Sequence, residues 1–246
     1  MSPLVNVTGI PSEDLDVVRT VFPDAVAAET PAHCPPDADR CAILLASPTA
    51  ETLAIALRPP ARLCAEVGIP IDPQHLAQLG VVHGHGLVLA LHTKTAYELN
   101  VAGLLCDALE EREAIPKAER GKIELVIHEL IANAILHGNL GVASAPKDAG
   151  LDGLDEFLDR VDQRLSDDEA ARRWVIVRCA WTPGRLSVAI IDQGGGFDVK
   201  AIDLMPESER AWGRGIEMAR EMASLLRFMR GGRIAKVRFD RPDQAE

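Results

Sequence analysis

Short apolar runs and helical patterns alternate along the first 80 residues. Three apolar runs have the length of buried strands: residues 5–10, 25–29 and 41–46. Two stretches with helical spacing follow runs of this kind: residues 12–22 and 49–57. Ser12 and Thr49 are residue types that favour helix starts. Alternating strands and helices predict a small α/β unit over residues 1–80.

Longer elements follow over residues 81–246. The pattern predicts a buried strand at 87–91, an amphipathic helix at 95–113 and a second helix at 117–137 that Gly138 ends as a C-cap. An inserted helix around residues 150–170 carries an apolar stripe. The tight turn Thr182-Pro183-Gly184 joins strands 174–180 and 185–192 in a hairpin. A helix at 215–229, a turn at Gly231-Gly232 and a strand at 233–239 complete the pattern.

Histidines gather near the boundary between these two regions. His83 and His85 flank a glycine in a turn-rich stretch, with His75 and His92 nearby. A metal site needs ligands that converge at fixed geometry, and this stretch adds no acidic or cysteine partner. The pattern therefore favours a loop over a metal site.

Composition and charge exclude several classes of protein. Of the 246 residues 47% are apolar and 26% charged, as in a soluble globular protein. Only 4% are aromatic, which argues against a stacking platform for single-stranded nucleic acid. The net charge of −11 argues against a protein that mainly binds the phosphates of DNA or RNA. Between Arg210 and Arg241, however, nine Lys/Arg face three Asp/Glu.

Cysteine usage and the amino-terminal pattern predict a cytoplasmic protein. The five cysteines contain no C-x-x-C pair and most lie in apolar stretches, so they are interpreted as small buried residues in a reducing compartment. The first residues lack the basic and apolar regions of a signal peptide. No stretch approaches 18 uninterrupted apolar residues, so no membrane span is expected.

The first candidate motif lies on the helix predicted at 117–137. Glu129, Asn133 and His137 are spaced four residues apart and share one stripe beside the apolar face. A carboxamide oxygen can ligate Mg²⁺, while a carboxylate one turn away can orient or deprotonate a nucleophile. Glu-x-x-x-Asn is also common on solvated helix faces.

Two glycine-rich motifs follow. Asp192-Gln-Gly194-Gly-Gly196-Phe197 comes directly after an apolar strand, where Asp192 can accept a hydrogen bond from an exocyclic amine such as adenine N6. Gly213-Arg214-Gly215 opens an amphipathic helix, whose first N–H groups can face an anion. The second of these motifs lacks the pattern of a P-loop and that of a dinucleotide fold.

Together, the three motifs in this order resemble the nucleotide-binding domain of the gyrase, chaperone, histidine-kinase and MutL (GHKL) ATPase superfamily, over roughly residues 86–240. The sequence motif Asn133-Ala-x-x-His137-Gly138 resembles that of anti-sigma factor serine-protein kinases. The short stretch between Phe197 and Gly213 is also similar to the one in these kinases. The resemblance implies an α/β sandwich with helices on one face of a mixed sheet. It would span residues 81–246, after the small α/β unit at 1–80. That unit is interpreted as a regulatory, docking or dimerisation domain. A degenerate receiver-like module is the alternative, because residues 7–10 lack the acidic cluster of a working receiver.

The resemblance also implies roles for individual residues. Glu129 would be the general base toward a serine or threonine hydroxyl, and Asn133 would ligate Mg²⁺. Asp192 would hold the adenine amine, with Gly194, Gly196 and Phe197 in the same box. His137 would be a further nucleotide-binding residue. Gly213, Arg214 and Gly215 would contact the phosphates. The cofactors implied are ATP and Mg²⁺.

The resemblance implies a protein partner as well, namely a sigma factor, its antagonist or both, and a homodimer. One alternative is a module that binds ATP without catalysis and sequesters its partner. A histidine kinase is less favoured, because His128 lies inside the helix that carries Asn133 and no histidine occurs in the helix at 95–113. A DNA-binding protein is also less favoured, because the carboxy-terminal cations are dispersed over several elements.

Overall fold

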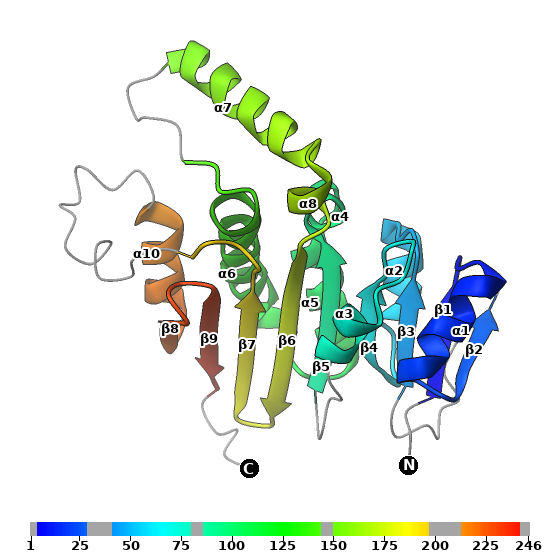
Figure 1. Ribbon diagram of the computed structural model, residues 1–246. Helices are drawn as coiled ribbons and strands as arrows, with labels where there is room; N and C mark the ends of the chain where they lie inside the picture. Colours follow the sequence, from blue (N-terminus) through cyan, green and yellow to red (C-terminus); the bar gives the residue numbers. More distant parts are fainter. Residues whose placement is uncertain (1–3, 29–40, 80–85, 144–149, 197–212, 242–246) are drawn as a thin grey trace.

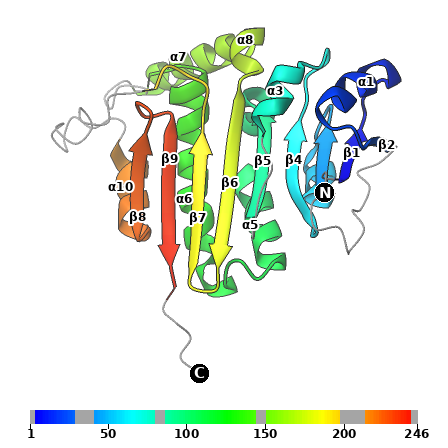
Figure 2. The same ribbon diagram turned by 60° about the horizontal axis from the view of Figure 1, so that its bottom comes forward.

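One continuous sheet runs through the molecule. The computed structural model describes residues 4–28, 41–79, 86–143, 150–196 and 213–241. The sheet has the strand order β2-β1-β3-β4-β5-β6-β7-β9-β8 (Figures 1 and 2). The strands are β1 (Leu4–Thr8), β2 (Ala25–Ala28), β3 (Cys41–Leu45), β4 (Ala61–Glu66), β5 (Gly86–His92), β6 (Trp174–Thr182), β7 (Arg185–Ile191), β8 (Leu225–Met229) and β9 (Ile234–Asp240).

The helices range in length from four to sixteen residues. They are α1 (Ser12–Val21), α2 (Ala50–Ala56), α3 (Pro73–Gln78), α4 (Thr93–Glu98), α5 (Val101–Glu111), α6 (Arg120–Asn133), α7 (Gly150–Leu165), α8 (Asp168–Ala171) and α10 (Gly213–Met222). None of the helices in the described residues combines the length and the apolar character that a bilayer span requires.

The first five strands are parallel and have helices on both faces. Their order, 2-1-3-4-5, is that of flavodoxin-like doubly wound folds. All five residues of β3 are buried, because a central parallel strand is covered on both faces. Helices α1 and α3 pack on one face, and α2 and α5 on the other.

The remaining strands are antiparallel and have their main core on one face. Strand β6 pairs with β5 on one side and forms the predicted hairpin with β7 on the other. Leu186, Val188 and Ile190 alternate with less buried residues along β7, as expected for a sheet with one covered face. Helices α5, α6 and α10 cover that face (Figure 1). The predicted fold class, a mixed sheet in an α/β sandwich, is confirmed.

Two predicted helices differ from the observed ones. The helix expected at 95–113 is divided into α4 and α5, because Leu99 is extended and the Asn100 side chain caps the new helix by accepting from Gly103 N at 3.1 Å. The helix expected at 215–229 ends at Met222. Residues 225–229 instead form β8, because pairing with β9 satisfies their backbone groups.

The predicted C-cap at Gly138 is also wrong. Helix α6 ends as an α-helix at Asn133 and continues as a π-helical turn over Ala134–Asn139, which contains Gly138. The positive φ expected of a C-cap glycine occurs three residues later, at Gly141 (64°).

Strand β4 and helix α3 were not predicted from the sequence pattern. These elements carry the parallel sheet from β3 to β5, so strands from residues 1–80 and from residues 81–246 belong to the same sheet. Three cysteines (Cys64, Cys106 and Cys179) are buried and free, as expected. Cys41, in contrast, is disulfide-bonded, which contradicts the interpretation of all five as isolated buried residues.

Candidate functional site

Helix α6 and its π-helical turn position three of the predicted site residues. Its apolar face is buried against the sheet through Ile123, Ile127 and Leu130. Glu129, Asn133 and His137 are half-buried. π-Helical turns are rare in proteins, and those that do occur are often found at functional sites.

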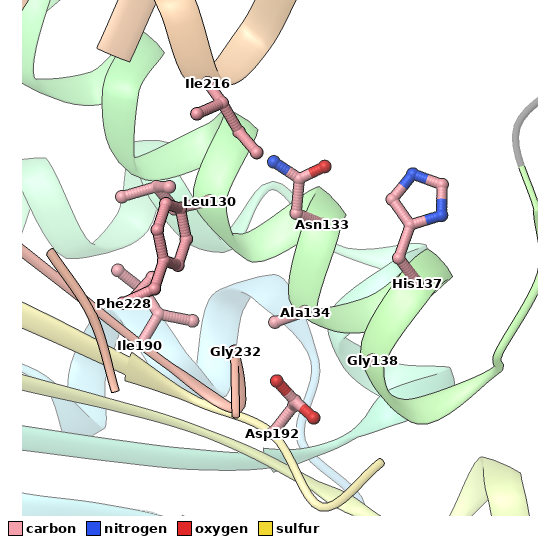
Figure 3. A pocket seen from close by; sticks show the side chains of 11 residues that line it. Leu130, Asn133, Ala134, His137, Gly138, Ile190, Asp192, Ile216, Phe228 and Gly232 are labelled. Atoms are coloured by element: carbon pink, nitrogen blue, oxygen red, sulfur yellow. The ribbon is translucent and has the colours of Figure 1, made fainter. Parts of the chain in front are cut away.

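A pocket lies between this helix, the sheet and α10 (Figure 3). It is lined by Leu130, Asn133, Ala134, His137, Gly138, Ile190, Asp192, Ile216, Phe228, Gly232 and Ala235. The lining contains three polar side chains predicted from the sequence, and the rest is apolar or glycine. The free volume is about 20 Å³, which holds about one water molecule. A ligand of nucleoside size therefore requires the walls to move apart.

Asp192 is the acidic group on the sheet side of the pocket. It follows β7, is 9% exposed, and its backbone N–H donates to Arg233 O. Its Oδ1 accepts from Gly194 N at 2.9 Å. Burial raises the pKa of Asp192 to about 6, although the Gly194 N–H and the charge of Arg233 oppose that rise. At neutral pH the carboxylate is an acceptor suited to an exocyclic amine.

Glycine lets the motifs approach one another. A Cβ on Gly138 would lie 2.5 Å from Cγ of Asp192, and a Cβ on Gly194 would lie 1.9 Å from the carbonyl oxygen of Gly138. Gly196 has a φ of +74°, and a Cβ there would lie 2.1 Å from the carbonyl oxygen of Gly231. The helix and the strand end are therefore in backbone contact.

Glu129 lies beside the start of α10. A Cβ on Gly215 would be 2.1 Å from Oε2 of Glu129, so the carboxylate is in contact with the third residue of that helix. The first N–H groups of a helix are unpaired within it and attract anions. The structure thus places the predicted base next to the predicted phosphate-binding backbone.

His137 lines the pocket with its ring turned away from Asp192 (Figure 3). Its Nδ1–H donates to the carbonyl oxygen of Val142 at 2.7 Å, because a carbonyl can only accept. Burial lowers the pKa of His137, against the effect of that hydrogen bond, and so favours the neutral ring. The bond also fixes the chain after the π-helical turn.

The structure brings most of the predicted residues together. Asn133, His137 and Asp192 share the pocket, and Gly194 contacts its floor at Gly138. Gly213 and Arg214 begin α10 beside Gly215. Phe197 lies outside the described residues.

Sequence reasoning missed the apolar walls and one buried amide. Phe228 was assigned to a helix, so its place in the pocket was not foreseen. Asn139 is 0% exposed, and its Nδ2 donates to Thr93 Oγ1 (2.8 Å) and Trp174 O (3.1 Å), while its Oδ1 accepts from Gln193 N (2.7 Å). The sequence signal for this buried amide was a polar residue, Asn139, directly after His137-Gly138.

The donor set fits Mg²⁺ held together with a phosphate ligand. Asn133 offers a carboxamide, and Glu129 lies one turn away on the same helix. Among the described residues, no side chain or backbone group is recorded in a hydrogen bond with the Asn133 carboxamide, and no group of three His, Cys, Asp or Glu forms a metal cage. Mg²⁺ commonly takes few protein ligands plus phosphates and water.

Comparison with known proteins agrees with this geometry. A family model described as histidine kinase-like ATPase domain matches residues 93–240. The match begins at α4, ends with β9 and contains all three motifs. A search of curated proteins found no match.

Proposed function

The chain belongs to the histidine kinase-like ATPase domain family, and from that premise we propose that it is an ATP- and Mg²⁺-dependent protein serine/threonine kinase of the anti-sigma factor type. Domains of this family bind ATP. Its proposed protein partner is a sigma factor, the antagonist of that factor, or both in turn, and the proposed working state is a homodimer.

The observation that carries the proposal is the contact between Glu129 and the start of α10, across the pocket from Asp192. In this arrangement Asp192 accepts a hydrogen bond from the adenine amine and the N–H groups at the start of α10 receive phosphate oxygens. Asn133 would hold Mg²⁺, which supplies charge neutralisation on the phosphates when bound. Glu129 accepts the proton of an incoming serine or threonine hydroxyl.

Phosphate transfer tests the catalytic role. The protein is incubated with γ-labelled ATP, Mg²⁺ and a candidate protein partner. We expect label on a partner serine or threonine. The Glu129→Gln variant should lower the transfer rate by roughly 10²-fold or more, the typical contribution of a general base, while ATP binding is retained.

Two further variants separate binding from chemistry. Asn133→Ala should lose Mg²⁺-dependent tightening of ATP binding, measured by calorimetry with and without Mg²⁺. Glu98→Gln changes an exposed carboxylate on α4, outside the pocket, and should behave as the parent. Transfer that is unaffected in Glu129→Gln would exclude this residue as the base.

A second candidate function is partner sequestration without transfer, and helix α7 favours it. Leu154 and Leu158 are 48% and 43% exposed on this acidic helix, which extends away from the sheet (Figure 1). Exposed leucines one turn apart are suited to protein contact. Tight partner binding without any labelled product would favour this function over kinase activity.

A further inference from the structure

A second pocket, remote from the nucleotide motifs, lies where the parallel and antiparallel parts of the sheet meet. Its volume is about 220 Å³. Its walls come from the segment after β4 (Val67, Gly68), from α3 (Leu76), and from the end of β5 (His92) and the start of β6 (Trp174). It therefore joins the amino-terminal half to the ATPase half.

The topology produces a crevice at this place. Strand β4 leads to α3, which packs on the face of α1, whereas β5 leads to α4 and α5, which pack on the face of α2. In open α/β sheets, ligands bind outside the carboxyl ends of adjacent strands whose connections leave toward opposite faces. The pocket occupies that position between β4 and β5.

A buried carboxylate fixes the position of His92, which lines the crevice. Glu66 ends β4, and its side chain is 8% exposed. Its Oε1 lies 3.1 Å from Nδ1 of His92 and accepts from Thr95 Oγ1, and its Oε2 accepts from His92 N. These contacts fix the imidazole ring, so its opposite edge faces the pocket, where a Cβ on Gly68 would lie 3.8 Å from Nε2.

Two groups around the pocket have no recorded partner. Among the described residues, none hydrogen-bonds Nε2 of His92 and none pairs with the exposed guanidinium of Arg172. The carboxylate of Asp72, by contrast, already caps α3 by accepting from Gln74 N. The free polar groups are therefore one imidazole nitrogen and one guanidinium. The guanidinium is a donor that suits a carboxylate, whereas Nε2 of a neutral ring whose Nδ1–H faces Glu66 is an acceptor.

We propose that this pocket binds a small organic carboxylate and that its occupancy strengthens nucleotide binding. The apolar part of the ligand lies against Val67, Ile71, Leu76 and Trp174, which are all buried. Its carboxylate accepts from the guanidinium of Arg172. The volume is below the 300–1,000 Å³ of typical drug-sized sites, so the ligand has only a few carbon atoms.

A short chain of hydrogen bonds leads from this pocket to Gln193, the residue after Asp192. The backbone N–H of Trp174 donates to Gln193 Oε1 at 2.6 Å, and the Trp174 carbonyl accepts from Asn139. Asn139 in turn accepts from Gln193 N, next to Asp192. A ligand packed on Trp174 therefore orders the segment that sets the adenine acceptor. This coupling rests on the proposed nucleotide site, whereas carboxylate binding does not.

The test uses the full chain and isovalerate as the probe, with isovaleramide as its neutral match. Calorimetry without nucleotide should detect isovalerate and not the amide. Arg172→Gln should weaken isovalerate binding about tenfold, since a charge-assisted hydrogen bond is lost. Gly68→Val should block the site by filling the space over Nε2. Arg58→Gln, which changes an exposed arginine with no recorded side-chain partner among the described residues, should bind as the parent does.

A second titration measures the coupling. With saturating isovalerate, the ATP dissociation constant should fall about fivefold, and Asn139→Ser should abolish that change. If the amide binds as well as the acid, or Arg172→Gln has no effect, the carboxylate site is wrong. If isovalerate binds but ATP affinity does not change, the coupling is wrong. If ATP itself does not bind, the proposed function fails while the isovalerate result still stands.

Discussion

Gly138 and Gly215 show how single residues determine the proposed nucleotide pocket. At both positions an added Cβ would lie closer to a neighbouring side chain than atomic contact permits, but the two neighbouring side chains differ. Gly138 faces the carboxyl group of Asp192, which is buried and fixed by hydrogen bonds. Gly215 faces the end of the long Glu129 side chain, which can rotate away.

Substitution by alanine should therefore separate stability from function. Gly138→Ala should destabilise the protein by about 1–3 kcal/mol, because Asp192 cannot move without breaking its contacts. Gly215→Ala should change stability little but displace the Glu129 carboxylate, which lowers phosphate transfer and leaves the melting temperature nearly constant. Thermal unfolding and transfer rates measure both effects.

Gly121→Ala provides the matched control. Gly121 lies in α6 with open space around it, so alanine should stabilise the protein by up to about 1 kcal/mol through helix propensity. A melting temperature that falls as far in Gly121→Ala as in Gly138→Ala would contradict the steric explanation.

Asp192 should make ATP binding depend on pH. Its pKa of about 6 is above the unfolded value of 3.8, so the folded protein holds the extra proton between these values. Stability from this carboxyl therefore falls as pH rises through that window, whereas its ability to accept from adenine increases. We expect ATP affinity to fall below pH 6, measured by calorimetry between pH 5 and 8.

Asp192→Asn is the control for that measurement, because it retains the shape of the side chain and removes the titration. The variant reports the titration of the ATP phosphates alone. If the parent and the variant show the same pH profile, Asp192 does not contact the base.

Among the elements, α4 and α5 show why boundaries are hard to predict. The apolar spacing over 95–113 is helical throughout, yet the chain breaks at Leu99 and Asn100. Asn100 is a favourable N-cap residue, but a cap competes with helix continuation only when tertiary packing permits the bend. The same limit explains residues 225–229, whose apolar run fits a helix or a strand and becomes β8 through pairing with β9.

The strength of this cap can be measured. Asn100→Ala should destabilise the protein by about 1 kcal/mol, because Gly103 N loses its acceptor. Asn100→Asp should retain most of the stability, since aspartate caps equally well. Equal loss in both variants, measured by urea unfolding, would show that the amide has another role.

The motif residues were easier to predict than the pocket walls. Glu129, Asn133 and Asp192 follow from chemistry that is local in sequence, because each lies at a helix stripe or strand end. Phe228 and Asn139 do not, because their roles depend on which strands pair and on a π-helical turn. Both features are decided by contacts between residues far apart in the chain.

At the scale of the whole molecule, the sheet unites residues that composition and pattern assign to separate domains. Strand β5 pairs in parallel with β4 and antiparallel with β6. The division at residue 80 remains a prediction about folding units. The continuous ladder indicates that both parts unfold together, since β5 belongs to both cores.

Two probes can test this cooperativity. Hydrogen exchange of β7 and β9 amides reports on the second half, while hydrogen exchange of β1 and β3 amides reports on the first. The two urea midpoints should coincide. Separate midpoints would establish two independent folding units instead.

The shared strand also determines how information can pass between the two halves. A hinge needs a segment that bends freely, and β5 is held on both edges by backbone ladders. Rotation of one half against the other would break those ladders. A stimulus received in the first 80 residues would therefore reach the proposed nucleotide site through small local rearrangements of side chains where β4, β5 and β6 meet. A longer or looser connecting segment would not change that coupling.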